Sequence, residues 1–222
     1  MATENRILFV EGTDDQHTIW SICESFKVEE TFVVEIPDSK GKINKSARPH
    51  EKGGIDNVLK ATQGFLATQN IERLGIVIDA DENLNSRWQK VKAILEKVGY
   101  TDLPKQPDSD GTIINQADKM IFGVWIMPDN KQRGFLETFL TFLVKENNKS
   151  WEQAKNCVDS LEHKPFIKEN TNHTEKAQIH TFLAWQEEPG KPFGQAITAK
   201  YLQTDNPNCE KFVDWLKRLF VD

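Results

Sequence analysis

Hydrophobic and polar positions follow two alternating patterns along the first two-thirds of the chain. Short apolar runs of strand length occupy residues 6–10, 31–36, 74–78 and 120–127. Between them, apolar residues recur at the three-to-four-residue spacing of amphipathic helices, over residues 14–26, 55–66, 88–98 and 134–144. Strands that alternate with helices favour a mostly parallel sheet flanked by helices. The pattern therefore predicts an α/β fold with a four-stranded, mostly parallel sheet.

Helical spacing replaces the strand pattern from about residue 147 onward. Residues 151–161 and 175–185 each predict a helix, and the last stretch carries one apolar stripe formed by Phe212, Trp215, Leu216, Leu219 and Phe220. We interpret this stripe as a face that packs on the core, because surface helices turn such stripes inward. We expect an α/β domain over residues 1–145 and a helical extension over 146–222 docked on it.

Two of the predicted strands stop abruptly on acidic residues. The first runs into Glu11-Gly12-Thr13-Asp14-Asp15, and the third runs into Asp79-Ala80-Asp81. The carboxyl ends of parallel strands meet at one edge of a sheet, and residues i and i+2 of an extended chain point the same way. Gly12 would let the backbone turn sharply after Glu11. Oxygen ligands suit Mg²⁺ or Mn²⁺, so Glu11, Asp79 and Asp81 predict a divalent-metal site.

Acids at strand ends also have an ordinary structural explanation. A carboxylate at the start of a helix accepts hydrogen bonds from free backbone N–H groups. Asp14, Asp15 or Asp81 could serve only in that way, and we expect Asp14 or Asp15 to open the first helix. The combination of Glu-Gly-x-x-Asp with a later Asp-x-Asp is more specific than any of these acids alone.

The chain resembles the Toprim (topoisomerase-primase) domain family over roughly residues 5–130. The resemblance rests on Val10-Glu11-Gly12-Thr13-Asp14-Asp15 and on Ile78-Asp79-Ala80-Asp81. It implies that Glu11, Asp79 and Asp81 gather at a Mg²⁺ site that acts on phosphodiesters. Less specific segments resemble small uncharacterised bacterial Toprim proteins related to nucleases of the overcoming-lysogenization-defect group; they are 128–130, 134–137, 176–180, Trp185 and 189–190.

Within that family, the remaining residues favour hydrolysis. A topoisomerase needs a tyrosine nucleophile and large strand-gating domains, whereas this chain has only Tyr100 and Tyr201 in 222 residues. A bacterial-type primase needs a zinc module, and the three cysteines show no Cys-x-x-Cys spacing. Metal-assisted hydrolysis of DNA or RNA remains. The resemblance alone implies a role in phage defence or nucleic-acid processing.

Other polar residues are candidates for the same site. Asp129 and Glu137 could supply a second metal position, although Glu137 would also be a favourable acid in the first turn of a helix. Lys176 and His180 lie four residues apart and share a helical face. If that face reaches the metal site, Lys176 could stabilise transition-state charge and His180 could move a proton; otherwise the face is ordinary and exposed.

The net charge of the chain does not by itself indicate whether the partner is a nucleic acid. The net charge of −6 argues weakly against indiscriminate nucleic-acid binding. The segment between Asp38 and Gly54 is nevertheless basic, with Lys40, Lys42, Lys45, Arg48 and Lys52. This segment is either a solvated loop or an arm that meets phosphates. The sequence contains neither a signal-peptide pattern nor an apolar stretch long enough for a membrane, which favours a cytoplasmic protein without a membrane partner.

Three functions stay open at this point. The first is a Mg²⁺-dependent nuclease, the second a non-catalytic module that holds a metal, a nucleotide or a phosphorylated partner. The third is a phosphatase or phosphotransferase that acts on a small nucleotide. The basic segment favours a polymeric substrate, whereas the acidic net charge favours a small one.

Overall fold

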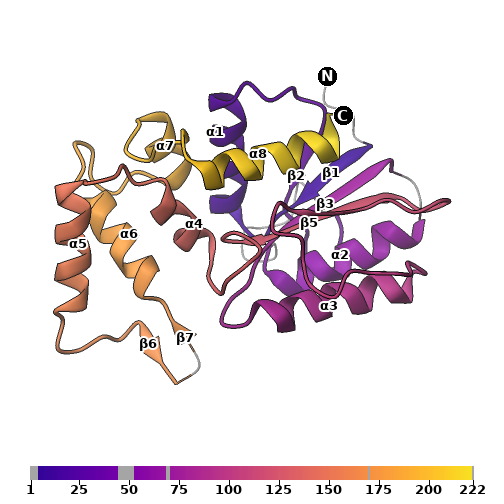
Figure 1. The fold of residues 1–222 in the computed structure, drawn as a ribbon, viewed down its shortest axis with the longest axis horizontal. Coiled ribbons are helices and arrows are strands. Elements are labelled where there is room, and N and C mark those ends of the chain that lie inside the picture. The colour runs from indigo at the N-terminus through magenta and orange to yellow at the C-terminus, as the bar shows by residue number, and fades with distance from the viewer. Residues whose placement is uncertain (1–4, 45–52, 69–70, 170, 222) are drawn as a thin grey trace.

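The protein is built around a five-stranded sheet with the order β2-β1-β3-β5-β4 (Figure 1). The structure is a computed structural model that describes residues 5–44, 53–68, 71–169 and 171–221. The strands are β1 (Arg6–Phe9), β2 (Val33–Glu35), β3 (Arg73–Asp79), β4 (Thr112–Ile114) and β5 (Ile121–Met127). Parallel pairing joins β2 to β1, β1 to β3 and β3 to β5, whereas β4 runs antiparallel to β5. The predicted mixed α/β fold with a mostly parallel sheet is confirmed.

β3 and β5 form the centre of the sheet because they are apolar on both faces. Residues 74–78 and 122–127 are all buried. Such uninterrupted apolar runs are typical of parallel strands that are covered by helices on both sides. In the register of the two strands, Arg73 pairs with Ile121 and Asp79 pairs with Met127. The carboxyl ends of both strands therefore lie at one edge of the sheet.

The prediction of four strands is wrong, because β4 adds a fifth strand at the edge beside β5. β4 has only 3 residues, too few to show the alternation by which a strand is recognised in a sequence. A separate hairpin, β6 (Ile167–Lys168) and β7 (Thr171–Asn172), has strands of 2 residues each. Strands this short are defined by their pairing partners, which the local pattern does not reveal.

Two helices cover one face of the sheet, α2 (Ile55–Thr68) and α3 (Leu84–Lys97) (Figure 1). Their apolar sides join those of β1, β3 and β5 in one buried cluster. α3 begins where the side chain of Asn83 accepts a hydrogen bond from the backbone N–H of Ser86. It ends before Gly99, whose φ of +86° is the left-handed conformation that glycine commonly supplies at helix C-termini.

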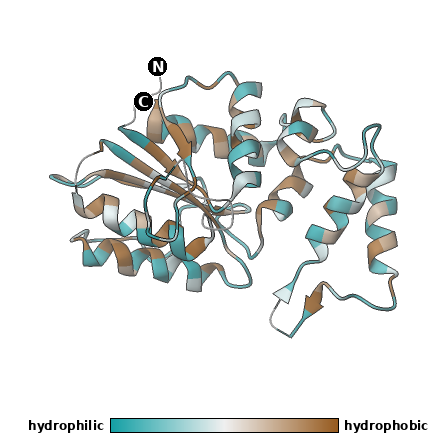
Figure 2. Ribbon diagram, turned by 180° about the vertical axis from the view of Figure 1, so that it is seen from behind, coloured by the Kyte–Doolittle hydropathy of each residue, from teal (hydrophilic) through white to brown (hydrophobic). Residues whose placement is uncertain are grey.

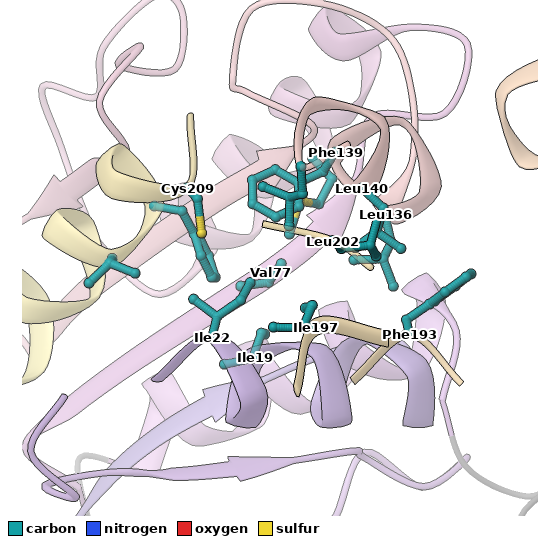
Figure 3. Close-up of a cluster of buried hydrophobic side chains, with 14 of the residues drawn as sticks. Ile19, Ile22, Val77, Leu136, Phe139, Leu140, Phe193, Ile197, Leu202 and Cys209 are labelled. Atoms are coloured by element: carbon teal, nitrogen blue, oxygen red, sulfur yellow. The ribbon is translucent and has the colours of Figure 1, made fainter. Parts of the chain in front are cut away.

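A second, larger cluster fills the opposite face. It joins the sheet to α1 (Thr13–Ser25), α4 (Leu136–Phe142), α7 (Phe193–Thr198) and α8 (Pro207–Phe220). Figure 3 shows Ile19 and Ile22 of α1, Val77 of β3 and Phe139 of α4 in this cluster. In Figure 2 much of the sheet is brown, which marks its strands as largely hydrophobic. All five residues of the predicted C-terminal stripe are fully buried, which confirms it as a core face.

Two facing glycines allow α8 to lie close to the sheet. Gly75 of β3 pairs with Gly123 of β5. A Cβ atom at Gly123 would lie 2.3 Å from Cδ2 of Leu219, and one at Gly75 would lie 2.9 Å from the same atom. Side chains at these two positions would therefore push α8 away, and the glycines make a shallow floor for its last turn.

The last carbonyl groups of α8 bind side chains from the beginning of the sheet. Arg6 Nη1 donates to the carbonyl oxygen of Phe220 at 2.5 Å, and Thr31 Oγ1 donates to the same oxygen at 3.0 Å. Arg73 Nη1 donates to the carbonyl oxygen of Leu219 at 2.6 Å. These donors satisfy acceptors that a helix end leaves without internal partners. The C-terminal end of the helix is therefore held by β1 and β3.

The remaining helices form a lobe beside the sheet. α5 (Lys149–Asp159) and α6 (Thr174–Ala184) pack on each other, and α6 also contacts α4 (Figure 1). Trp151 of α5 meets Phe182 of α6 edge to face, with ring centroids 5.7 Å apart. Among the described residues, none of the helices combines the length and apolarity that crossing a membrane requires.

The close approach of α8 to Gly75 and Gly123 predicts that Gly123→Ala changes the stability of the protein. The added methyl group would overlap Leu219, so we expect the free energy of unfolding to fall by about 1–3 kcal/mol. Gly64→Ala is the control, because Gly64 lies in α2 with open space at its Cβ position. That change should raise stability by about 0.5–1 kcal/mol. Urea unfolding of both variants measures this, and equal shifts would contradict the prediction.

Candidate functional site

The first two predicted site residues meet where β1 and β3 end. Glu11 lies just after β1, and Asp79 is the last residue of β3, the parallel neighbour of β1. Oε1 of Glu11 accepts a hydrogen bond from the backbone N–H of Asp79 at 2.9 Å. The two acids are thus in direct contact, as the convergence of parallel strand ends predicts.

Asp79 also connects the sheet to α4. Its Oδ1 accepts a hydrogen bond from the backbone N–H of Leu136 at 2.9 Å, at the first residue of α4. That N–H has no partner within its own helix, so Asp79 caps α4 from a distant strand. Each of the two carboxylates of Glu11 and Asp79 keeps a second oxygen that is not used in these bonds.

Asp15 is a further member of this group. The sequence places it in the Glu-Gly-x-x-Asp motif, but the role predicted for it was that of a helix cap. That prediction is wrong for both Asp14 and Asp15, since α1 has Gly12 at its N-cap and no side chain caps it. Asp15 lies inside the first turn and is only 9% exposed. Its spacing of four residues from Glu11 is the signal that could have indicated a shared site.

Gly12 has a different role from the one expected. Its φ of −157° and ψ of 177° are extended values that any residue adopts, so the chain makes no glycine-dependent turn there. A Cβ atom at this position would lie 3.3 Å from Oδ2 of Asp15. The absent side chain leaves room beside the carboxylate of Asp15.

Asp81 lies next to the group, but its side chain is held differently. The backbone leaves the extended conformation here, with φ at +52°, so the i, i+2 argument for a shared direction with Asp79 does not apply. Asp81 exchanges two backbone hydrogen bonds with Gly134, at 3.0 and 2.9 Å. Its half-exposed carboxylate forms an ion pair with the buried guanidinium of Arg87 in α3.

Glu137 and Lys176 bring a second cation to the group. Glu137 lies in the first turn of α4, where its negative charge is favourable. Its Oε1 lies 2.7 Å from Nζ of Lys176 in α6. Lys176 therefore reaches the acids, whereas the ring of His180, four residues later, packs against Phe193 with a centroid distance of 5.1 Å.

The other predicted residues lie outside this contact network. Asp129 accepts hydrogen bonds from Lys131 and Gln132 in its own turn. Lys40 and Lys42 are exposed. Lys45, Arg48 and Lys52 lie outside the described residues.

Gly53 and Gly54, the last residues of the basic segment, are anchored at the site. The backbone N–H of Gly54 donates to the carbonyl oxygen of Glu11 at 2.8 Å. Gly53 has φ at +82°, and a Cβ atom there would lie 2.3 Å from that same oxygen. Glycine is therefore required where the segment after Lys42 returns to the sheet beside Glu11.

Charges in this group are incompletely balanced. Arg87 pairs with Asp81 and Lys176 pairs with Glu137, while Glu11, Asp15 and Asp79 have no ion-pair partner among the described residues.

The pKa values of these three carboxyl groups are all raised, in each case chiefly because burial penalises the charged form. The negative charge of Glu11 contributes next for Asp15 and Asp79. The backbone hydrogen bond from Asp79 lowers the pKa of Glu11, in opposition to burial. The charged forms of these carboxyl groups are therefore disfavoured as long as no cation compensates them.

The donor atoms suit a hard divalent cation, since all are carboxylate oxygens. As they are placed, however, no group of three or more His, Cys, Asp or Glu side chains within the described residues could hold a metal ion. The ion pairs on Asp81 and Glu137 and the backbone bonds of Glu11 and Asp79 hold these oxygens in other contacts. Coordination would require side chains of the group to change rotamer.

The raised pKa of Asp15 predicts a pH-dependent stability. Its pKa of about 7 lies above the 3.8 of an ordinary aspartate. The folded protein thus holds this proton more tightly, so the associated stability is present below about pH 4 and is lost as the pH rises through about 7. We expect Asp15→Asn to stabilise the metal-free protein by about 1–3 kcal/mol at about pH 8, and not at about pH 4.

Urea unfolding in the presence of EDTA measures this difference. Asp14→Asn is the matched control, because Asp14 is the exposed neighbour in the same helical turn. A stabilisation by Asp15→Asn that is the same at both pH values would contradict the assigned burial of charge.

Comparison with known proteins gives one result. A family model described as "Protein of unknown function (DUF3226)" matches residues 5–221. Neither a curated protein nor a solved structure matches the chain. Because the family model spans the sheet, both sets of covering helices and the side lobe, the chain belongs to the DUF3226 family.

Proposed function

We propose that the protein is a Mg²⁺- or Mn²⁺-dependent hydrolase of phosphodiester bonds in DNA or RNA. The observation that carries this proposal is the group of three carboxylates formed by Glu11, Asp15 and Asp79. Asp15 is buried and the other two are partly buried, and none of them has an ion-pair partner among the described residues. Burying several like charges is costly unless a cation compensates them. The resemblance of the two acidic motifs to the Toprim family supports a metal ion as that cation.

Glu11, Asp15 and Asp79 would hold the first ion, together with Asp81 once its carboxylate leaves Arg87. Glu137 is the candidate for a second position, with Asp129 as a further one. A bound ion of this kind polarises a phosphate and lowers the pKa of an attacking water.

The protein's own cations would act on the substrate. Lys176 lies 2.7 Å from Glu137, so its ammonium group is within reach of a phosphate held at the acids and can stabilise charge that develops there. Lys40 and Lys42 are exposed on a segment that returns beside Glu11. They would attract the backbone of a polymeric substrate, which favours a nucleic acid over a free nucleotide.

Cleavage assays with Asp79→Asn test the proposal. Asparagine can still cap α4 through its side-chain oxygen, but it lacks the charge that a metal ion requires. We expect wild-type protein to cut plasmid DNA or single-stranded RNA with Mg²⁺ or Mn²⁺, and the variant to lose at least about 100-fold in rate. Asp214→Asn, an exposed change on α8, should cut like wild type.

Three outcomes would overturn the proposal. Metal binding without cleavage of any polymer would indicate a non-catalytic binding module. Turnover of free nucleotides alone would indicate a phosphatase. Equal loss of activity in Asp79→Asn and Asp214→Asn would remove the acids from the reaction.

Lys176→Met should separate metal binding from cleavage. The change frees Glu137 from its cation, so Mn²⁺ should bind about 3–10-fold more tightly by calorimetry. The cleavage rate should nevertheless fall by about 10- to 100-fold, because the transition state loses a positive charge.

Lys191→Met is the matched control. Lys191 also pairs with a glutamate, Glu188, at 2.8 Å, but that partner is exposed. Both quantities should stay at wild-type levels in this variant. Weaker Mn²⁺ binding by Lys176→Met would contradict the assigned competition between the ammonium group and the metal.

A further inference from the structure

A pocket of about 370 Å³ lies beside the acidic group, between the start of α3 and β7. Its lining includes Asp81, Ser86, Arg87, Lys90, Phe135 and His173. Asp81 therefore belongs both to the pocket and to the candidate metal site. A ligand in this pocket would lie next to whatever binds at the carboxylates.

The acidic side chains of the pocket already have partners. Asp81 is paired with Arg87. Glu82 lies 3.6 Å from Arg133, and its Oε1 accepts a hydrogen bond from the backbone N–H of Asn172 at 2.8 Å. The negative charges that face the pocket are thus compensated from within the protein.

The basic side chains of the pocket keep free donors. Lys90 is exposed and has no ion-pair partner in the described part of the chain. Arg87 binds Asp81 through Nη2, which leaves other N–H groups of its five for a ligand. Ser86 adds a hydroxyl from the same helical turn. Lysine, arginine and hydroxyl donors around one space are the usual means of binding phosphate oxygens.

One wall of the pocket is aromatic. Phe135 is almost fully buried, and the half-buried ring of His173 meets it edge to face, with centroids 5.2 Å apart. His173 lines the pocket and its ring is partly exposed, so a flat group in the pocket can contact it. Nucleobases stack on rings of this kind.

We propose that this pocket binds the phosphate ester of a nucleotide adjacent to the one acted on at the carboxylates. Lys90, Arg87 and Ser86 hold the phosphate, and His173 contacts the base or sugar. The position of this subsite rests on the proposed function, whereas the binding of phosphate in the pocket does not. Either a nucleic-acid backbone or a free mononucleotide could supply the ester.

Binding measured without metal tests the pocket separately from catalysis. A short single-stranded DNA with a 3′ fluorophore and a 5′ phosphate is titrated with full-length protein in EDTA, and fluorescence anisotropy gives the affinity. We expect Lys90→Ala to weaken binding about 3–10-fold and to reduce the slope of log affinity against log salt by about 0.7, the value for one phosphate contact on a single strand. Ser86→Ala should weaken binding without a change in that slope.

Lys97→Ala is the matched control, because Lys97 is an exposed lysine at the other end of α3. This variant should bind like wild type. Circular dichroism establishes that each variant is folded. Competition with inorganic phosphate and with a nucleoside monophosphate identifies the source of the ester, because a polymer subsite resists both and a mononucleotide site yields to the second.

Equal affinities and salt slopes for wild type, Lys90→Ala and Lys97→Ala would overturn the pocket, as would absence of oligonucleotide and nucleotide binding by wild type. Cleavage with an unaltered Lys90→Ala affinity would leave the proposed function standing without this subsite. Binding that depends on Lys90, with no cleavage under any metal, would leave the pocket standing without the hydrolase.

Discussion

Asp79 is the residue at which the sheet, Glu11 and α4 meet. Its backbone N–H binds Glu11 after β1, and its carboxylate binds the first residue of α4. The carboxyl groups of Glu11 and Asp79 therefore lie close together. They repel each other where both are ionised. Everything packed around these acids must hold them together against that repulsion.

Packing on the opposite face supplies much of that restraint. One apolar cluster runs from α1 through β3 to α4, α6 and α8, so the elements that carry Asp15, Asp79, Glu137 and Lys176 share one core. Strained or repulsive groups persist only where surrounding structure fixes them, and such places are often functional. One core therefore supports the backbone on both sides of the acids, and the ion pairs with Arg87 and Lys176 are formed by side chains at its margin.

Much of this arrangement could be predicted from the sequence, because its signals are local. Apolar runs that end on acids indicated β1, β3 and the position of Glu11 and Asp79, and a stripe at helical spacing indicated the buried face of α8. β4, with 3 residues, has no comparable pattern. The ion pair between Arg87 and Asp81 was not predicted. It depends on the positive φ of Asp81, and the residue type alone does not indicate that backbone conformation. The role predicted for Asp15 was wrong, since the same residue type occurs both as a helix cap and as a buried acid within the first turn.

The seating of α8 has a consequence for how the protein is made. Arg6 binds the carbonyl oxygen of Phe220 across 214 positions of sequence, and the helix covers apolar residues of β3 and β5. A ribosome must therefore complete nearly the whole described chain before this face of the sheet is shielded from water. Until then Val77 and Trp125 remain available to other nascent chains or to a chaperone. Closure of this face depends on contacts between residues far apart in the sequence, and such contacts generally form more slowly than local helices.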